Sequence, residues 1–388
     1  SVFKGSLQGQ TVTVITEGGR VGNESVSTSS LLELNENSYG MFFLIADPTF
    51  PSYYRVFSER QGFIVYSQDE RVAVCPFYET SCDLHRDAVL KLLGKKKSKL
   101  YINKPITEPT KSLNILSFSP QTVTAGTQTV LTINGTDFGT GGPSANAYVQ
   151  FTDANNGQAA TYYAADLLDY ISWTNTQIQV QVPSRAGTGL LQVVINGVVS
   201  SSVTPLTVNY SLINASNHYR LRLINDDAIG GSTWKYSTNT TTTQRSAFIR
   251  AMDTWKCTSG IAWTMGASTT VTSAINGDGI NLFAMSSSLA AGVLGVCYNY
   301  MSSCNGNDWH LFEQDILFRS NGTIWNYTTA QPTSSELDFE SVAFHELGHA
   351  HLLGHVNDGN DVMYFSIGSG VAKRTPTPYN VIAANHIM

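Results

Sequence analysis

The pattern of apolar and polar positions divides the chain into three parts. In residues 1–97 the apolar positions fall in short runs separated by turn residues, which predicts a mainly β module. The uninterrupted apolar run 40–46 predicts a strand buried on both faces, whereas 84–93 has the spacing of a helix. Two prolines break regular structure in the segment that follows, so we expect a linker over residues 98–112.

Residues 113–209 have the pattern of an entirely β unit. Short strands are spaced regularly, with glycine, asparagine and proline between them, and long helical patterns are absent. The segment resembles the IPT/TIG domain, and the stretches that carry the resemblance are 115–120 (ILSFSP), 131–139 (LTINGTDFG), 172–174 (SWT) and 182–189 (VPSRAGTG). The resemblance implies an immunoglobulin-like β-sandwich. It implies no particular function, because such sandwiches serve both as spacers and as binding modules.

Residues 216–388 combine strand and helix patterns. Alternation over 219–224 predicts a strand, and the apolar stripe along 243–255 predicts an amphipathic helix. More strands are expected at 279–285, 292–300 and 309–318. A second helix is expected to begin at Ser334 or Ser335, so the segment has the composition of an α/β domain.

Composition narrows the class of protein. Only 13% of the residues are charged and the net charge is −6, so no basic surface for nucleic acid is expected. No apolar run approaches the roughly 20 residues that a membrane-spanning helix needs, and the first residues lack the apolar core of a signal peptide. Abundant threonine, serine, asparagine and glycine favour β-rich modules outside the cell. We therefore expect a secreted or cell-surface protein, and the sequence leaves its oligomeric state open.

The second predicted helix contains the residues of a metal site. His345 and His349 are one helical turn apart, so both imidazoles project from the same face. That spacing allows two ring nitrogens to bind one Zn²⁺. Glu346 lies between them in sequence and to one side of the same face, where its carboxylate is placed to take a proton from a metal-bound water.

His355 is the candidate for a third ligand. On a straight helix it would lie about 15 Å along the axis from His345, so the chain has to stop being helical and double back before it. Gly354 is the residue expected to allow this reversal, because glycine adopts left-handed backbone angles without penalty. Three histidines and one open position are typical of a catalytic zinc site.

Together with Met363, eight residues beyond His355, these residues resemble the metzincin clan of zinc endopeptidases and, within it, the matrixins. The resemblance implies a methionine-containing turn beneath the metal and a secreted bacterial enzyme. One position departs from the clan pattern, which has glycine where this chain has Leu352. A left-handed leucine costs about 1 kcal/mol, so either the strain is accepted there or the turn has moved toward Gly354.

The predicted reaction is the hydrolysis of internal peptide bonds in a protein or peptide substrate. The resemblance assigns the activation of the attacking water to Zn²⁺, and the transfer of its proton to the leaving amine to Glu346. Val293, Leu294 and Gly295 are the candidate edge strand on which an extended substrate pairs. Matrixins often also contain a structural zinc and Ca²⁺. The corresponding region has Asp308, His310, Glu313 and Asp315, without a complete ligand set.

The five cysteines leave several pairings open. Cys75–Cys82 and Cys297–Cys304 would make two short disulfides, and Cys257 could instead pair with Cys297 or Cys304. Cys75 is also a candidate to cap the zinc in a latent form.

Two other hypotheses compete with an active protease. In one, the chain is a secreted adhesin or binding protein whose protease domain is inactive. In the other, the N-terminal module keeps the protease latent. The remaining histidines are expected to have structural roles or to be solvated, and His351 is expected to point away from the zinc.

Overall fold

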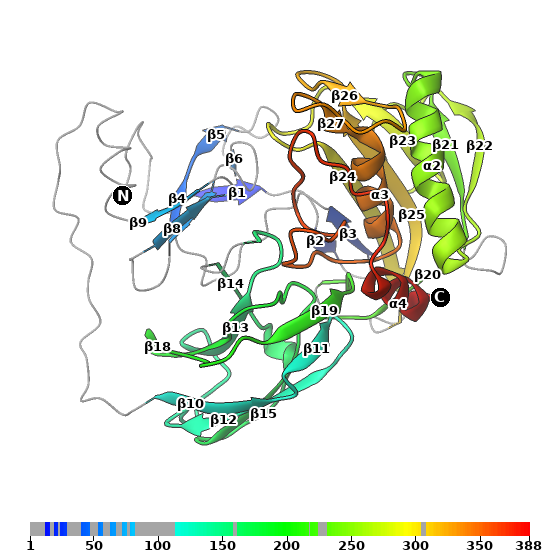
Figure 1. Cartoon of the computed structure of the whole chain (residues 1–388). Helices are drawn as coiled ribbons and strands as arrows, with labels where there is room; N and C mark the ends of the chain where they lie inside the picture. Colours follow the sequence, from blue (N-terminus) through cyan, green and yellow to red (C-terminus); the bar gives the residue numbers. More distant parts are fainter. Residues whose placement is uncertain are drawn as a thin grey trace, which may run out of the picture.

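The computed structural model of the 388-residue chain describes residues 113–157, 161–216, 218–223, 231–303 and 308–388, and separate strands between residues 12 and 81. Figure 1 shows two large bodies, a central domain built from strands β10 to β19 and a C-terminal domain that contains the helices α2, α3 and α4. No helix among the described residues is long and apolar enough to cross a membrane.

The apolar run 40–46 is divided between two sheets. Strand β4 pairs with β7, whereas β5 pairs with β6, and Phe43 between them is exposed. The prediction of one strand buried on both faces is therefore wrong, because Phe43 and Ile45 face solvent. The predicted helix 84–93 lies outside the described residues. The strands of this part are β1 (Thr13–Ile15), β2 (Gly19–Val21), β3 (Glu24–Thr28), β4 (Gly40–Phe42), β5 (Leu44–Ala46), β6 (Tyr53–Val56), β7 (Phe63–Tyr66), β8 (Val72–Cys75) and β9 (Tyr78–Ser81).

Two four-stranded sheets of the central domain enclose one apolar core. Their orders are β10-β12-β16-β15 and β14-β13-β17-β18, and β11 pairs with β19 beside them. Alternate residues of β12, such as Leu131 and Ile133, are fully buried, as expected for a strand with one face on a core. The elements are β10 (Asn114–Ser119), β11 (Thr122–Ala125), β12 (Val130–Thr136), β13 (Ala147–Thr152), β14 (Tyr162–Ala164), η2 (Leu167–Asp169), β15 (Tyr170–Trp173), β16 (Gln177–Gln181), β17 (Gln192–Ile195), β18 (Val198–Ser201) and β19 (Thr207–Ser211).

The C-terminal domain has one mixed sheet. Its order is β2-β3-β24-β25-β23-β21-β22, and β20 also pairs with β25. Strand β24 runs antiparallel to β25, and β3 from the N-terminal part pairs with the outer side of β24. The strands are β20 (Leu221–Leu223), β21 (Thr233–Ser237), β22 (Thr264–Thr269), β23 (Asn281–Ser286), β24 (Gly295–Ser303), β25 (Trp309–Arg319), β26 (Trp325–Asn326) and β27 (Leu337–Asp338).

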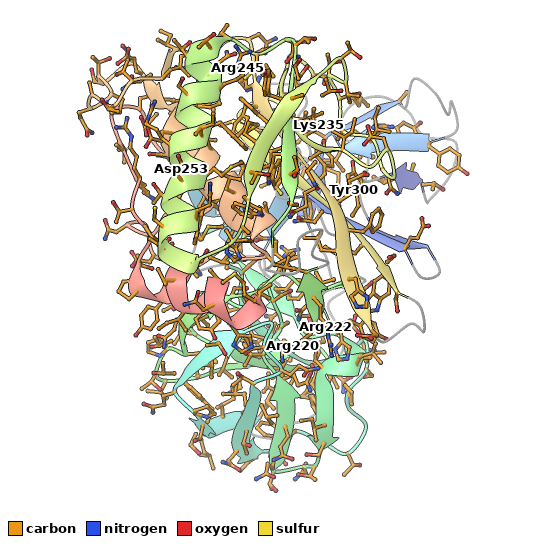
Figure 2. The ribbon with its side chains drawn as sticks, turned by 90° about the vertical axis from the view of Figure 1, so that its right-hand side faces the viewer. Arg220, Arg222, Lys235, Arg245, Asp253 and Tyr300 are labelled. Atoms are coloured by element: carbon orange, nitrogen blue, oxygen red, sulfur yellow. The ribbon has the colours of Figure 1, made fainter. Side chains whose placement is uncertain are left out.

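Helix α2 (Thr242–Ser259) lies along this sheet, with Arg245 near its N-terminal end and Asp253 in its middle (Figure 2). The predicted apolar stripe is its buried face, which includes Phe248 and Trp255. The helix begins with a capping box between Thr241 and Gln244, and ends at Gly260, whose φ of 78° is left-handed.

Helix α3 (Phe339–Ala350) packs against α2. Helix α4 (Pro378–Ile387) follows it in sequence and contacts α2 and β19. The prediction that α3 begins at Ser334 or Ser335 is wrong. Asp338 is its N-cap, because residues 337 and 338 form strand β27 beside β26.

Candidate metal centre

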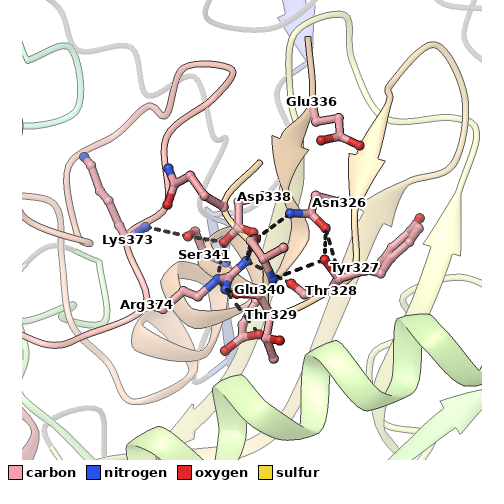
Figure 3. A network of polar contacts seen from close by, with 12 residues as sticks. Asn326, Tyr327, Thr328, Thr329, Glu336, Asp338, Glu340, Ser341, Lys373 and Arg374 are labelled. Atoms are coloured by element: carbon pink, nitrogen blue, oxygen red, sulfur yellow. Dashed lines mark hydrogen bonds and ion pairs between the residues drawn. The ribbon is translucent and has the colours of Figure 1, made fainter. Parts of the chain in front are cut away.

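A buried carboxylate fixes the N-terminus of α3. Asp338 is fully buried, and its Oδ2 accepts hydrogen bonds from the backbone N–H of Ser341 at 3.0 Å and from Nε of Arg374 at 2.9 Å. The Arg374 guanidinium also donates to the carbonyl oxygens of Thr328 and Thr329 (Figure 3). Its hydrogen bond to Asp338 raises the pKa of Arg374. The helix therefore starts from a neutralised, hydrogen-bonded cap.

Side chains from the sheet satisfy the C-terminal end of the same helix. The carbonyl of His349 accepts a hydrogen bond from Asn299 Nδ2 at 3.2 Å, and that of Ala350 accepts one from Gln314 Nε2 at 2.7 Å. Both amides are buried and lie on β24 and β25. Because both ends are fixed, the face that carries the histidines has a defined position relative to the sheet.

Three imidazoles converge on one point. The Nε2 atoms of His345 and His349 are 3.0 Å apart, those of His349 and His355 are 3.1 Å apart, and those of His355 and His345 are 3.3 Å apart. Tetrahedral zinc bound to nitrogen at about 2.0–2.1 Å requires nitrogens roughly 3.3 Å apart. The three histidines therefore have the spacing to hold a metal ion, and they are the group that meets this criterion among the described residues.

Each imidazole is oriented through its other nitrogen. Nδ1 of His345 lies 2.6 Å from the carbonyl oxygen of Val362, and Nδ1 of His349 lies 2.8 Å from that of Leu353. Nδ1 of His355 lies 2.8 Å from Oδ1 of Asn155 in the central domain. All three partners are acceptors, so each Nδ1 carries the proton and each Nε2 directs a lone pair at the point where the three rings converge.

The chain leaves α3 and reaches His355 through residues 351–357, which we name the ligand turn. Its left-handed residue is Leu352, with φ of 61°, and Gly354 does not have a positive φ. Of the two alternatives, the strained Leu352 is the one observed, and the expectation that Gly354 makes the reversal is wrong. Leu352 is fully buried against residues that include Trp309 and Leu311, and its carbonyl accepts a hydrogen bond from Ile213 at 2.8 Å. These contacts offset the strain of a left-handed leucine.

Gly354 is needed for a different reason. Its backbone N–H donates to the carbonyl of Ser211 at 2.8 Å, and a Cβ at this position would lie 2.5 Å from Ser211 Oγ. Glycine therefore permits close contact with the end of β19, rather than a left-handed angle.

Glu346 lies beside the first residue of β24. It is 3% exposed, and a Cβ on Gly295 would be only 2.7 Å from its Oε1. Glycine at position 295 thus leaves room for the carboxylate against the strand. Of the three residues predicted for the edge strand, Gly295 begins β24, whereas Val293 and Leu294 precede it. The carbonyls of Val293 and Leu294 accept hydrogen bonds from Nε and the backbone N–H of Arg319, respectively.

Met363 lies next to the helix that carries the first two histidines. A Cβ on Gly348 would be 2.4 Å from Met363 Sδ. The Met363 backbone is held by Asp361, whose Oδ1 accepts from its N–H at 2.7 Å, and by Val356, whose N–H donates to the Met363 carbonyl at 3.1 Å. Met363 and the ligand turn are therefore hydrogen-bonded to each other.

Other predicted residues have roles away from this centre. His351 is fully buried between Trp255 and Trp263, and its Nε2 lies 2.9 Å from Ser259 Oγ. Burial lowers the pKa of His351 to about 4, so the ring is neutral and packs in the core. This agrees with the expectation that it points away from the metal position.

The predicted acidic cluster holds a loop through backbone amides. Glu313 accepts hydrogen bonds from the N–H groups of Gly277 and Gly279, and Asp315 accepts from those of Ile275 and Leu282. Burial raises the pKa of Asp315 to about 7 despite these bonds. Both carboxylates thus hold the backbone of residues 275–282 in place. Asp308 instead forms an exposed ion pair with Arg222 at 3.6 Å. In Figure 2, Arg222 lies near the boundary with the central domain.

The structure describes the side chains of two of the five cysteines, Cys257 and Cys297. Cys257 has an exposed free thiol, so the structure does not pair it with Cys297. Cys297 is fully buried, and burial, together with the nearby Glu346 carboxylate, holds the pKa of its thiol well above the ordinary range. Cys82 and Cys304 lie outside the described residues, as does the side chain of Cys75. Both short disulfides and the zinc-capping role of Cys75 remain predictions.

Sequence reasoning missed Asn155. It belongs to the polar segment 153–157 between β13 and β14, which has the composition of an ordinary turn. Asn155 is 200 positions from His355, and no spacing rule connects the two residues.

Comparisons with known proteins agree with the resemblances seen in the sequence. Residues 113–210 match the model of the IPT/TIG domain, and residues 231–377 match the model of the Matrixin family. No curated protein matches the chain.

Matches among solved structures are distant. A protein of unknown function from Bacteroides thetaiotaomicron is 18% identical with a TM-score of 0.22, and covers 28% of this chain. SGBP-B from a xyloglucan utilization locus in Bacteroides uniformis is 11% identical with a TM-score of 0.20, and covers 54% of this chain. This chain spans 25% of the first structure and 53% of the second.

Proposed function

Because the chain carries a matrixin domain preceded by an IPT/TIG domain, we propose that it is a zinc-dependent endopeptidase that hydrolyses internal peptide bonds. The observation that carries the proposal is the triangle of Nε2 atoms from His345, His349 and His355. We further propose that the enzyme is secreted or displayed on a bacterial surface. The low charge content and the β-rich modules favour that location.

The three histidines are the proposed zinc ligands. Their spacing fits tetrahedral nitrogen coordination, and each has an acceptor on Nδ1 that leaves Nε2 available to the metal. When bound, zinc lowers the pKa of a coordinated water and polarises a carbonyl oxygen.

Glu346 is the proposed general base. It takes a proton from the attacking water and delivers it to the nitrogen of the leaving amine. Its position against Gly295 supports this role, because no side chain at position 295 separates the carboxylate from β24. A peptide that pairs with the start of β24 would bring its scissile bond close to Glu346. Met363 is the proposed methionine turn, which supports the helix at Gly348.

Replacing Glu346 with glutamine tests the proposal most directly. The substitution keeps the size of the side chain and removes the base, so we expect turnover of a casein-type substrate to fall by about 10²- to 10⁴-fold. Zinc content measured on the same preparation should be unchanged. A chelator should abolish wild-type activity, and added zinc should restore it.

The rival hypothesis, a binding protein with an inactive protease domain, predicts a different result. Zinc-loaded wild-type protein would then show no chelator-sensitive turnover, and Glu346→Gln would not differ from it. That outcome would reject the endopeptidase.

One observation favours a latent form of the same enzyme. Strand β3 pairs with β24 from Tyr298 to Ser302, and this pairing begins three residues beyond Gly295 on the strand that we propose for substrate. A segment of the N-terminal part therefore occupies the edge along which an extended peptide would continue.

Removal of residues 1–112 tests latency. The truncated protein should turn over substrate faster than the full chain at equal zinc occupancy, because the outer side of β24 becomes available. Equal rates for the two proteins would discard the latency hypothesis and leave the endopeptidase proposal untouched.

A further inference from the structure

The ligand turn is built against the central domain. The carbonyl of Leu352 accepts a hydrogen bond from the N–H of Ile213, and Gly354 N–H donates to the carbonyl of Ser211, each at 2.8 Å. Leu212 and Leu353 form the β-bridge between these two bonds. The turn is thus paired, residue by residue, with the chain that leaves β19.

Two side chains extend this contact beyond the backbone pairing. Asn357 Nδ2 donates to the carbonyl of Thr188 at 3.3 Å, and His355 Nδ1 meets Asn155 Oδ1 at 2.8 Å. Gly157, two residues after Asn155, also contacts the C-terminal domain. A Cβ at position 157 would overlap the ring of Phe365. Figure 1 shows this end of the central domain, where β13 joins β14, directed toward the C-terminal domain.

The interior of the central domain holds Asn155 in place. Its backbone N–H donates to Asp153 Oδ1 at 2.9 Å, and Asp153 is buried and paired with Arg185. The neighbouring Ala154 N–H donates to the Arg185 carbonyl at 2.9 Å. Arg185 in turn stacks on the ring of Tyr163, 4.6 Å from its centroid. The amide oxygen that faces His355 therefore belongs to a rigid turn.

The three ligands differ in where their orienting acceptors come from. His345 and His349 use backbone carbonyls of their own domain, at Val362 and Leu353. His355 uses a side chain of the preceding domain. A backbone carbonyl remains whatever the local side chain is, whereas the acceptor on His355 depends on a single asparagine.

We propose that the IPT/TIG domain completes the metal site, and that Asn155 is a positioning residue that fixes the tautomer and the ring orientation of His355. This inference rests on the proposed zinc function. It makes zinc affinity depend on a residue outside the matrixin domain.

Zinc affinity of the full chain, measured by competition with a chromophoric chelator, tests the proposal. Asn155→Ala removes the acceptor, and we expect zinc to bind about 10- to 100-fold more weakly. Asn155→Asp retains an acceptor oxygen and should bind zinc at least as tightly as the wild type. Asn156→Ala is the matched control, because Asn156 lies in the same turn and its amide faces Asp153 rather than a histidine.

Thermal unfolding provides a second readout that is independent of proteolysis. Zinc should raise the Tm of the Asn155→Ala protein less than that of the wild type or Asn156→Ala, since a weaker ligand stabilises less at equal concentration. The zinc-free proteins should unfold at similar temperatures.

Three results would overturn the inference: wild-type affinity in Asn155→Ala, equal weakening in Asn155→Asp and Asn155→Ala, or equal weakening in Asn156→Ala. Wild-type protein that binds no zinc would instead reject the proposed function itself. The two failures are therefore distinguishable.

Discussion

Helix α3 and the ligand turn deliver the same kind of side chain to one point by different physical means. His345 and His349 are placed by helical geometry, and the cap at Asp338 and the amides of Asn299 and Gln314 hold the helix. His355 is placed by a turn whose strained residue, Leu352, and close contact, at Gly354, are both stabilised by other parts of the chain. Local rules thus place two of the proposed ligands, and tertiary contacts place the third.

Replacing one leucine in α3 and one in the ligand turn should give the largest changes in unfolding free energy that test this difference. Leu347 in α3 and Leu352 in the turn are both fully buried, so replacing either with alanine should cost about 2–5 kcal/mol of unfolding free energy. Glycine should be worse than alanine at position 347 by about 1 kcal/mol, because it weakens a helix. At position 352 glycine should be better than alanine by about 1 kcal/mol, because φ is left-handed.

Chemical denaturation of the four variants checks the prediction. The informative quantity is the sign of the glycine-minus-alanine difference at each position. The same sign at both positions would show that the turn is not made at Leu352.

Gly354 tests the contact between the turn and β19. In Gly354→Ala the new methyl group would overlap Ser211, so we expect a loss of about 1–3 kcal/mol in unfolding free energy. Ser211→Gly has a cost of its own, because the Ser211 hydroxyl donates to the carbonyl of Ser184. It should cost less in the Gly354→Ala background than in the wild type, because there it also removes the atoms that clash. Gly359→Ala is the control in the same loop, since no atom lies within 4 Å of its Cβ position and its stability should hardly change. An equal cost of Ser211→Gly in both backgrounds would place the loss caused by Gly354→Ala elsewhere.

A smaller effect comes from an ion pair near the boundary of the two domains. His218 Nδ1 lies 2.9 Å from Asp169 Oδ1, and this contact raises the pKa of His218. Burial raises the pKa of Asp169 in spite of the pairing, so the histidine is the better reporter. Protonated His218 is favoured in the folded state. Its stabilisation is present in full below the ordinary pKa of about 6.5, and is lost as the pH rises through the raised value.

The test compares unfolding free energies of the wild type and His218→Gln in chelator, which removes any effect of bound metal. The wild type should be more stable at pH 6 by less than about 1 kcal/mol, and this advantage should shrink toward pH 9. An advantage independent of pH would show that the charge of His218 contributes nothing.

Part of the arrangement of the three histidines could be predicted, because it depends on local geometry. The spacing of His345 and His349 follows from the helical repeat, and the family resemblance added His355 and Met363. The path between them stayed open between a strained Leu352 and a turn moved toward Gly354. Placing a left-handed angle at Leu352 requires knowing that its side chain is buried and that Ile213 pairs with its carbonyl. Propensity alone favoured Gly354.

The secondary structure shows the same difference between local pattern and tertiary contact. Alternation of apolar and polar residues predicted the strands of the central domain, and the apolar stripe predicted helix α2. Each of these elements packs on the core with one face. The run 40–46 misled because apolar content does not reveal that neighbouring residues join different sheets. Asp338 as the cap of α3 was missed because the preceding serines are equally good caps, and only the pairing of β27 excludes them.

The position of Asn155 also bears on how the protein is made. A chain synthesised from its N-terminus produces the central domain well before the ligand turn, and domains generally fold as they emerge. The surface formed by Asn155, Ser211 and Ile213 can therefore be in place when residues 351–357 arrive. On this view the central domain acts as an internal template for the last of the three proposed ligands. A matrixin domain transplanted without it would lack the surface on which its third histidine is set.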